Sequence, residues 1–223
     1  MSDKTERSKR NVPVPLQKLL AIDKAVTHQF CCTVERTLPG LQYRKHYKLL
    51  EYSCHALPWF FCSIAALWLL WNEELFQTQV NLLFGLTLDC ILIALTKAAV
   101  RRRRPFNNDD DMLLTVGADA YSFPSGHVSR AIMVLYFTSQ IIKSNFFLCL
   151  FLAIWAFSVS VSRILLKRHH LLDVAGGVVF GFVEGWLISH LWLSKATALW
   201  LVQYLSDEAL NLEGLQDDVD PID

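Results

Sequence analysis

Long apolar stretches separated by polar residues are the feature that most constrains how this chain can fold. A helix needs about 20 mostly apolar residues to cross a bilayer, and five stretches approach or reach that length. Apolar residues make up 53% of the 223-residue chain, more than a soluble core needs. The stretches cover residues 54–71, 80–97, 125–143, 145–162 and 171–193. We therefore predict an all-α fold, a multi-span transmembrane helical bundle with about five spans and an additional N-terminal amphipathic helix.

Two of these stretches have features of their own. The third is short, and its apolar part alone is barely long enough to span a bilayer. The fifth contains small residues that allow close helix packing in lipid, Gly176, Gly177, Gly181 and Gly185. Any one stretch is also compatible with burial in a soluble all-α protein. Five in succession favour a membrane bundle.

The polar segments divide the chain into four regions. Residues 1–15 are basic and contain two prolines, which predicts a disordered tail. Residues 16–50 are expected to form an amphipathic helix, ending near the Pro-Gly pair at 39–40, and a connector. This helix is expected either to lie on the membrane surface or to pack against the bundle. Residues 51–205 form the membrane domain, and residues 206–223 form an acidic tail.

Charge and cysteine content exclude several classes of protein. The formal net charge is zero, so nothing in the overall balance predicts a nucleic-acid partner. The six cysteines do not have the spacing of a zinc site or of a disulfide framework. For the adjacent pair Cys31 and Cys32, lipidation is an alternative to a purely structural role.

Polar residues with chemical potential lie at the ends of the predicted spans. Lys97 closes the second span and the run "RRRRP" follows it, whereas "PSGH" opens the third. Arg163 closes the fourth span, and "HHLLD" opens the fifth. Because successive spans alternate in direction, all these segments should emerge on one membrane face. Basic residues often anchor span ends, but that does not explain histidines and a carboxylate at the same face.

This combination of side chains fits phosphoryl transfer. Cations stabilise the charge on the transferring phosphoryl group, and the small Gly126 allows backbone N–H groups to approach an anion. One histidine can attack phosphorus, oriented by a carboxylate, while a second protonates the leaving oxygen. On a helix, His169 and His170 lie four and three residues from Asp173. Spacing alone does not choose between the two histidines.

Three motifs together resemble a known family. They are Lys97 with "AAVRRRRP", the "PSGH" of residues 124–127, and the Ser-Arg pair at 162–163 followed at fixed spacing by His169 and Asp173. In this order and spacing they resemble the signature of the type 2 phosphatidic acid phosphatase superfamily of lipid phosphatases. The resemblance covers roughly residues 50–195, and the three-part match is more specific than any single part.

The resemblance implies a role for each matching residue. The phosphate-binding residues would be Lys97, Arg104, Ser125, Gly126 and Arg163. His169 would be the nucleophile that forms a phosphohistidine, Asp173 would orient it, and His127 would be the acid for the leaving group. His170 falls in a variable part of the motif, where we expect an interfacial polar residue. No metal and no cofactor are implied.

Within the superfamily, the arginine run, "YSFPSGH" and the short loops look most like the polyisoprenoid and presqualene diphosphate phosphatase branch. This resemblance implies a metal-independent hydrolase for farnesyl, geranylgeranyl or presqualene diphosphates and monophosphates in the endoplasmic reticulum and nuclear envelope. Phosphatidate, lysophosphatidate or sphingoid phosphates are alternative substrates. A non-catalytic membrane scaffold and a transporter or channel are alternatives of other classes. The six-span plan of the family is poorly matched before residue 54, and the oligomeric state stays open.

Several charged residues have two possible roles. The run at residues 101–103 is expected to anchor the spans at the interface, or else to attract a second phosphate. The three aspartates at 109–111 are expected to form a solvated loop rather than a metal site. Asp89 and Glu184, within apolar stretches, are expected to make structural polar contacts rather than catalytic ones. With five spans, the excess of basic residues places the catalytic face toward the cytoplasm.

Overall fold

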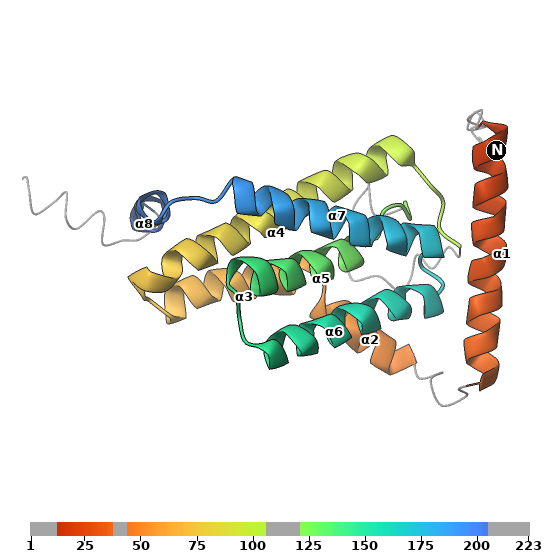
Figure 1. Ribbon diagram of the computed structural model, residues 1–223, viewed down its shortest axis with the longest axis horizontal. Helices are drawn as coiled ribbons and strands as arrows, with labels where there is room; N and C mark the ends of the chain where they lie inside the picture. Colours follow the sequence, from red (N-terminus) through yellow and green to blue (C-terminus); the bar gives the residue numbers. More distant parts are fainter. Residues whose placement is uncertain (1–12, 38–43, 106–120, 205–223) are drawn as a thin grey trace, which may run out of the picture.

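The described part of the chain is a bundle of helices (Figure 1). The computed structural model describes residues 13–37, 44–105 and 121–204. Among these residues no strand is formed, only an isolated bridge between Arg103 and Tyr121. The helices are α1 (Val14–Thr37), α2 (Arg44–Ser53), α3 (Ala56–Leu69), α4 (Glu73–Val100), α5 (Gly126–Tyr136), the π-helix η4 (Phe137–Ile141), α6 (Phe146–Leu165), α7 (Leu171–His190) and α8 (Lys195–Tyr204). The prediction of an all-α membrane fold is confirmed.

Local sequence signals explain where the long helices begin and end. Asn72 caps α4, since its side-chain oxygen accepts a hydrogen bond from the Glu74 N–H at 2.9 Å. Asn145 caps α6 in the same way through the Leu148 N–H, also at 2.9 Å. At the other end of α4, Arg101 adopts a left-handed conformation with φ of 53°, a geometry that often terminates a helix.

Helix length limits how many segments can cross a membrane. Within the described residues, α4, α6 and α7 are long and apolar enough to span, and α2 with α3 adds a fourth span if this pair, bent by 46°, counts as one. The third predicted stretch forms α5 and η4, together 16 residues or about 24 Å of helix, shorter than a hydrocarbon core of about 30 Å. The predicted count of about five spans therefore exceeds the three to four that length and composition support.

Exposed apolar side chains cover the outside of the bundle. On α6 they are Phe146, Phe147, Leu148, Leu150, Phe151, Ile154 and Phe157, and on α7 they are Val179, Phe182, Val183 and Trp186. A soluble domain rarely leaves such large contiguous apolar patches exposed, whereas a lipid-facing surface requires them. The outer face of the bundle is thus suited to lipid.

α5 lies at the centre of the bundle and packs most extensively against α7. The buried side chains of Leu86, Met133 and Ile188 join α4, α5 and α7 into one core. Close approach of α5 and α7 depends on small residues, because a Cβ at Gly181 would lie 2.4 Å from the backbone oxygen of Ser129.

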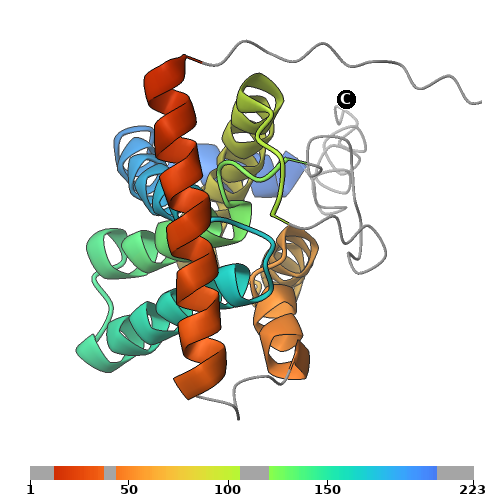
Figure 2. The same cartoon turned by 90° about the vertical axis from the view of Figure 1, so that its right-hand side faces the viewer.

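The ends of four elements meet at one end of the bundle, as the alternating direction of the spans predicts. The C-terminal ends of α4 and α6 lie there together with the N-terminal ends of α5 and α7 (Figure 1). α1 crosses this end, in front of the bundle in Figure 2. It packs against α6 and α7, so the amphipathic helix predicted from residue 16 contacts the bundle. α8 packs on the first half of α4, at the opposite end.

Candidate active site

The predicted phosphate-binding and catalytic residues come from four separate segments at this end. Lys97 is in the last turn of α4, Arg163 is in the last turn of α6, and His169 is in the loop before α7. Ser125 is the N-cap of α5. All four are at most 5% exposed. Charged and imidazole side chains are thus gathered in a buried position, which is uncommon unless they are paired or used.

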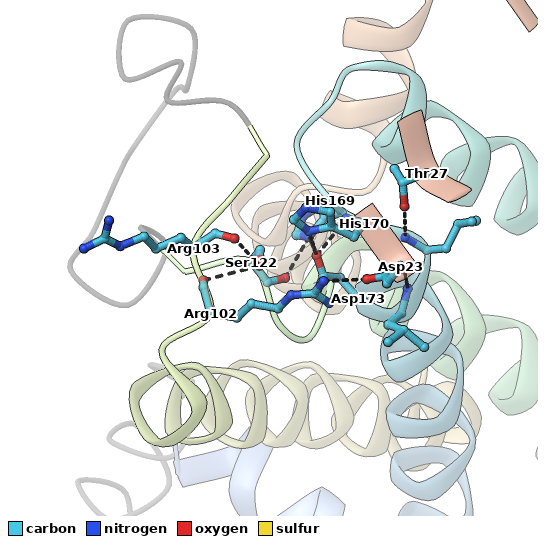
Figure 3. Close-up of polar contacts among 10 residues, drawn as sticks. Asp23, Thr27, Arg102, Arg103, Ser122, His169, His170 and Asp173 are labelled. Atoms are coloured by element: carbon cyan, nitrogen blue, oxygen red, sulfur yellow. Dashed lines mark hydrogen bonds and ion pairs between the residues drawn. The ribbon is translucent and has the colours of Figure 1, made fainter. Parts of the chain in front are cut away.

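Backbone groups fix the position of the His169 ring. The ring Nδ1 lies 2.8 Å from the backbone oxygen of Ser122 (Figure 3). The backbone N–H of His169 donates to the backbone oxygen of Arg163 at 3.3 Å. A carbonyl oxygen only accepts, so in the neutral ring Nδ1 carries the proton and Nε2 keeps its lone pair. This tautomer is the one that a nucleophilic Nε2 requires.

Asp173 lies near His169 but makes its closest contacts elsewhere. Its Oδ2 is 4.0 Å from His169 Nδ1, longer than a hydrogen bond, and accepts from the His170 N–H at 2.7 Å. Its Oδ1 accepts from Arg102 at 2.7 Å. Direct orientation of His169 by Asp173 stays a prediction, and Ser122 is the nearer partner.

His170 differs from its expected role as an interfacial polar residue. Its side chain is buried, and the residue is the N-cap of α7. Its Nδ1 lies 3.2 Å from Asp173 Oδ2. The expectation was wrong because the side chain is buried in the protein beside Asp173, which no local pattern in the doublet indicates.

Arg163 shares a carboxylate with a second arginine. Glu51 Oε1, on α2, is 3.3 Å from Arg163 Nη1 and 3.2 Å from Arg168 Nη1. All three side chains are buried. Two guanidinium groups against one carboxylate leave a net positive charge beside the site. Glu51 lies outside the three motifs and Arg168 occupies a variable position of the third, so neither was predicted as a partner of Arg163.

Two buried polar atoms of the "PSGH" segment have no hydrogen-bond partner in the described part of the chain, Ser125 Oγ and His127 Nε2. A buried polar atom without a partner costs about 1–3 kcal/mol, which is usually recovered when a ligand binds. Both atoms lie at the N-terminal end of α5, where N–H groups and the helix dipole favour an anion. A phosphate oxygen is a suitable partner for such atoms.

The electrostatic environment keeps His169 neutral. Burial, followed by the positive charge of Arg104, holds the pKa of His169 well below its usual value. Lys97 and Arg163 act in the same direction, and Asp173 opposes them. A neutral imidazole at neutral pH is the form that can attack an electrophile.

The structure describes the surroundings of some charged residues for which two roles were predicted. Arg102 is neither an interfacial anchor nor a free cation, since it pairs with both Asp23 and Asp173. Arg101 and Arg103 are exposed, and in Figure 3 the Arg103 side chain points away from the catalytic residues. The three aspartates at 109–111 lie outside the described residues, as does most of both tails.

The ionisable residues within the apolar stretches make structural contacts. Arg130 pairs with Asp89, and Ser129 donates to Glu184 at 2.8 Å, all buried inside the bundle. Among the residues with described positions, no group of three or more His, Cys, Asp or Glu side chains has the arrangement of a metal site.

Comparison with known proteins identifies the family of this chain. The family model described as the PAP2 superfamily matches residues 78–196. The chain therefore belongs to the PAP2 superfamily. It is an integral, multi-pass membrane protein and a phosphatase of this type.

Two curated proteins are similar in sequence. A probable lipid phosphate phosphatase beta of Arabidopsis thaliana is 34% identical over 191 residues, covering 74% of this chain and 86% of that protein. A lipid A 4'-phosphatase of Porphyromonas gingivalis is 30% identical over 155 residues, covering 64% of each.

Two crystal structures share the fold. A transmembrane PAP2 type phosphatidylglycerolphosphate phosphatase from Bacillus subtilis aligns with a TM-score of 0.57 and 21% identity, over 78% of this chain and 86% of that one. LpxE of Aquifex aeolicus aligns with a TM-score of 0.56 and 20% identity, over 73% and 93%. At these identities the likeness concerns the fold.

Proposed function

We propose that this phosphatase removes phosphate from lipid phosphates, chiefly polyisoprenoid diphosphates and monophosphates such as farnesyl, geranylgeranyl and presqualene diphosphate. The observation that carries the proposal is the buried, neutral His169 within electrostatic reach of Lys97, Arg104 and Arg163 at one end of a membrane bundle. The lipid class is supported by the relatives named for lipid phosphate and lipid A, and the polyisoprenoid class by the motif resemblance.

The proposed reaction has two steps. Lys97, Arg104 and Arg163 hold the non-bridging oxygens of the phosphoryl group, together with Ser125 Oγ and the N–H groups near Gly126. In the first step His169 Nε2 forms a bond to phosphorus as the bond from phosphorus to the leaving oxygen breaks, and His127 gives that oxygen a proton.

In the second step His127 takes a proton from water as the water oxygen attacks the phosphohistidine. The bond between phosphorus and His169 Nε2 breaks, and inorganic phosphate leaves. The proposed steps use no metal ion, in keeping with the metal-independent reaction that the motif resemblance implies. Ser122 keeps the His169 ring in the reactive tautomer throughout.

The cellular location follows from the same resemblance. We place the protein in the endoplasmic reticulum and nuclear envelope, where its lipid-facing helices hold the phosphate site at the bilayer boundary. A prenyl tail would lie between the helices while its diphosphate reaches the cationic end.

The test measures phosphate release by purified protein in detergent containing a chelator. The parent protein should release phosphate from farnesyl diphosphate, and His169→Ala should lower the rate by about 1000-fold or more, since removing a nucleophile disables the whole mechanism. His190→Ala, at the opposite end of α7 and exposed, is the matched control and should keep the parent rate. Parent-like activity of His169→Ala, or loss of parent activity with chelator, would contradict the proposal.

A second substrate class is favoured by the relatives, because their names refer to lipid phosphates in general and to lipid A. The same assay with phosphatidate, lysophosphatidate and sphingoid phosphates decides between the classes. A higher kcat/KM for phosphatidate than for any prenyl phosphate would replace the polyisoprenoid assignment. Absence of hydrolysis of every lipid would favour a non-catalytic scaffold.

A further inference from the structure

The start of α7 is capped by side chains from another helix. Thr27 Oγ1 accepts a hydrogen bond from the Leu171 N–H at 3.1 Å, and Asp23 Oδ1 accepts from the Leu172 N–H at 3.1 Å. Both acceptors are on α1, more than 140 residues away in the sequence (Figure 3). The first N–H groups of a helix have no partner within that helix, so α1 supplies what α7 lacks.

Arg102 connects the same α1 carboxylate to Asp173. One guanidinium nitrogen of Arg102 pairs with Asp23 Oδ2, and the other donates to Asp173 Oδ1 at 2.7 Å (Figure 3). Asp173 Oδ2 in turn accepts the His170 N–H at 2.7 Å. The arginine is therefore held between two buried carboxylates, and the side chains of Asp23, Arg102 and Asp173 are each at most 9% exposed.

These contacts surround the residue that precedes the cap of α7. His169 directly precedes His170, the N-cap, so the direction in which its side chain leaves the backbone depends on how α7 begins. His170, Leu171 and Leu172 each donate their N–H to a side-chain oxygen, two of which belong to α1. Without α1, two consecutive N–H groups and one arginine nitrogen at this point would lose these partners.

α1 lies outside the part of the chain that matches the family model, which begins at residue 78. The buried residues of α1 recur every four positions, Asp23, Thr27 and Cys31, and form one face of the helix. A helix that only covered the bundle would bury apolar side chains there. Instead two of the three are hydrogen-bond acceptors, and both are used on α7.

We infer that α1 positions the nucleophile, with Asp23 and Thr27 acting as positioning residues for His169 through the cap of α7 and through Arg102. The inference rests on the proposed role of His169. It extends the functional site to Asp23, about 55 residues ahead of the family match. A small misplacement of a catalytic group lowers turnover without weakening substrate binding, so the effect should fall on kcat.

The test compares variants of the full chain by kcat and KM for farnesyl diphosphate and for phosphatidate in detergent. Asp23→Ala and Thr27→Val should lower kcat by about 10- to 100-fold with KM changed by less than about twofold. Thr27→Ser keeps the hydroxyl acceptor and should restore the parent kcat. Thr33→Val, at an exposed position of α1, is the matched control and should behave as the parent chain does.

The outcomes separate positioning from simple stability. If Asp23→Ala does not fold, Asp23→Asn keeps an acceptor for the Leu172 N–H and removes only the ion pair with Arg102. Parent kcat in Asp23→Asn and Thr27→Val would overturn the inference. An equal loss of kcat in Thr33→Val or Thr27→Ser would also overturn it. The same holds if the loss of kcat disappears when each variant is assayed well below its thermal midpoint.

A further variant separates this inference from the proposed function. If His169→Ala is inactive and the α1 variants keep the parent kcat, only the inference about α1 fails. If His169→Ala keeps the parent rate, the proposed function fails, and the inference falls with it.

Discussion

At the residue scale, the environment of His169 decides what the site can do. A backbone oxygen orients the ring, and burial with nearby cations keeps it uncharged. The two effects are complementary, because the first leaves Nε2 unprotonated in the neutral ring and the second maintains the neutral ring at physiological pH. If His169 is the nucleophile, as proposed, its ring is already neutral and oriented before any phosphate binds.

The lowered pKa of His169 predicts the acid side of the pH profile. The ring is nucleophilic above its pKa, so kcat/KM should stay level as pH falls through about 6.5, the ordinary histidine value, and should decline only at lower pH. In Arg104→Gln a positive charge near the ring is lost, so the pKa should rise and the decline should begin at higher pH. The measurement is kcat/KM for farnesyl diphosphate as a function of pH.

The exposed Arg101 provides the control, since Arg101→Gln makes the same change of charge at a residue that is not among the groups acting on His169. Its acid limb should coincide with that of the parent chain. An unchanged limb in Arg104→Gln would contradict the electrostatic account of His169. Arg104→Gln should also lower the overall activity, since Arg104 is a proposed phosphate ligand. That loss does not change the pH at which kcat/KM begins to decline.

At the scale of elements, the contact between α5 and α7 sets the geometry of the site. α5 carries "SGH" at its start and α7 follows His169, so their separation determines how far the "SGH" segment is from His169. Backbones touch at Gly177 and Gly181, where an added Cβ would lie 2.6 Å from Ser125 O and 2.4 Å from Ser129 O. In addition, the Ser125 backbone N–H donates to the backbone oxygen of Asp173 at 3.0 Å.

Substitution at this contact should therefore loosen the bundle. In Gly181→Ala the new methyl group meets a backbone oxygen that cannot move aside, and the expected loss of stability is about 1–3 kcal/mol. Val179→Ala, at an exposed position of the same helix, should have little effect. The thermal midpoint in detergent measures both. An unchanged midpoint in Gly181→Ala would mean that the two helices are not held as closely as described.

At the scale of the whole molecule, α1 and the bundle have different relations to a bilayer. The long apolar helices run the length of the bundle, whereas α1 crosses its catalytic end (Figures 1 and 2). Besides its buried face, α1 exposes Leu19, Ile22 and Val26 on an adjacent flank. A helix that crosses the end of a membrane bundle with an apolar flank is suited to the bilayer interface.

The distribution of basic residues predicts which side of the membrane the catalytic end faces. Arg101, Arg103 and Lys167 are exposed at the catalytic end, while Lys143 and Lys195 are at the other. The positive-inside rule places the more basic end in the cytoplasm. In sealed microsomes with the cytoplasmic face outward, an impermeant maleimide should label Lys167→Cys above the parent chain, and Lys195→Cys only after permeabilisation. The reverse pattern would invert the orientation.

Much of this organisation was predictable from local patterns in the sequence. The apolar stretches predicted helices that occur as α4, α6 and α7, because burial in lipid depends mainly on consecutive apolar residues. The three motifs predicted that their segments would reach one end of the bundle, as the ends of α4, α5, α6 and α7 do, while the roles of the individual side chains stay predictions. The span count was predicted less well: the third stretch was recognised as short but still counted as a span, and apolar composition does not reveal that α2 and α3 are bent.

What the sequence by itself determined was the membrane bundle and the segments that carry its cationic end, because each apolar stretch and each motif consists of residues close together in the chain. Only the tertiary structure decided that Ser122 rather than Asp173 is nearest to His169, that Glu51 pairs with Arg163, and that α1 caps α7. Such partners lie far apart in the sequence. Their contacts depend on how whole helices pack, which no periodicity or local motif encodes.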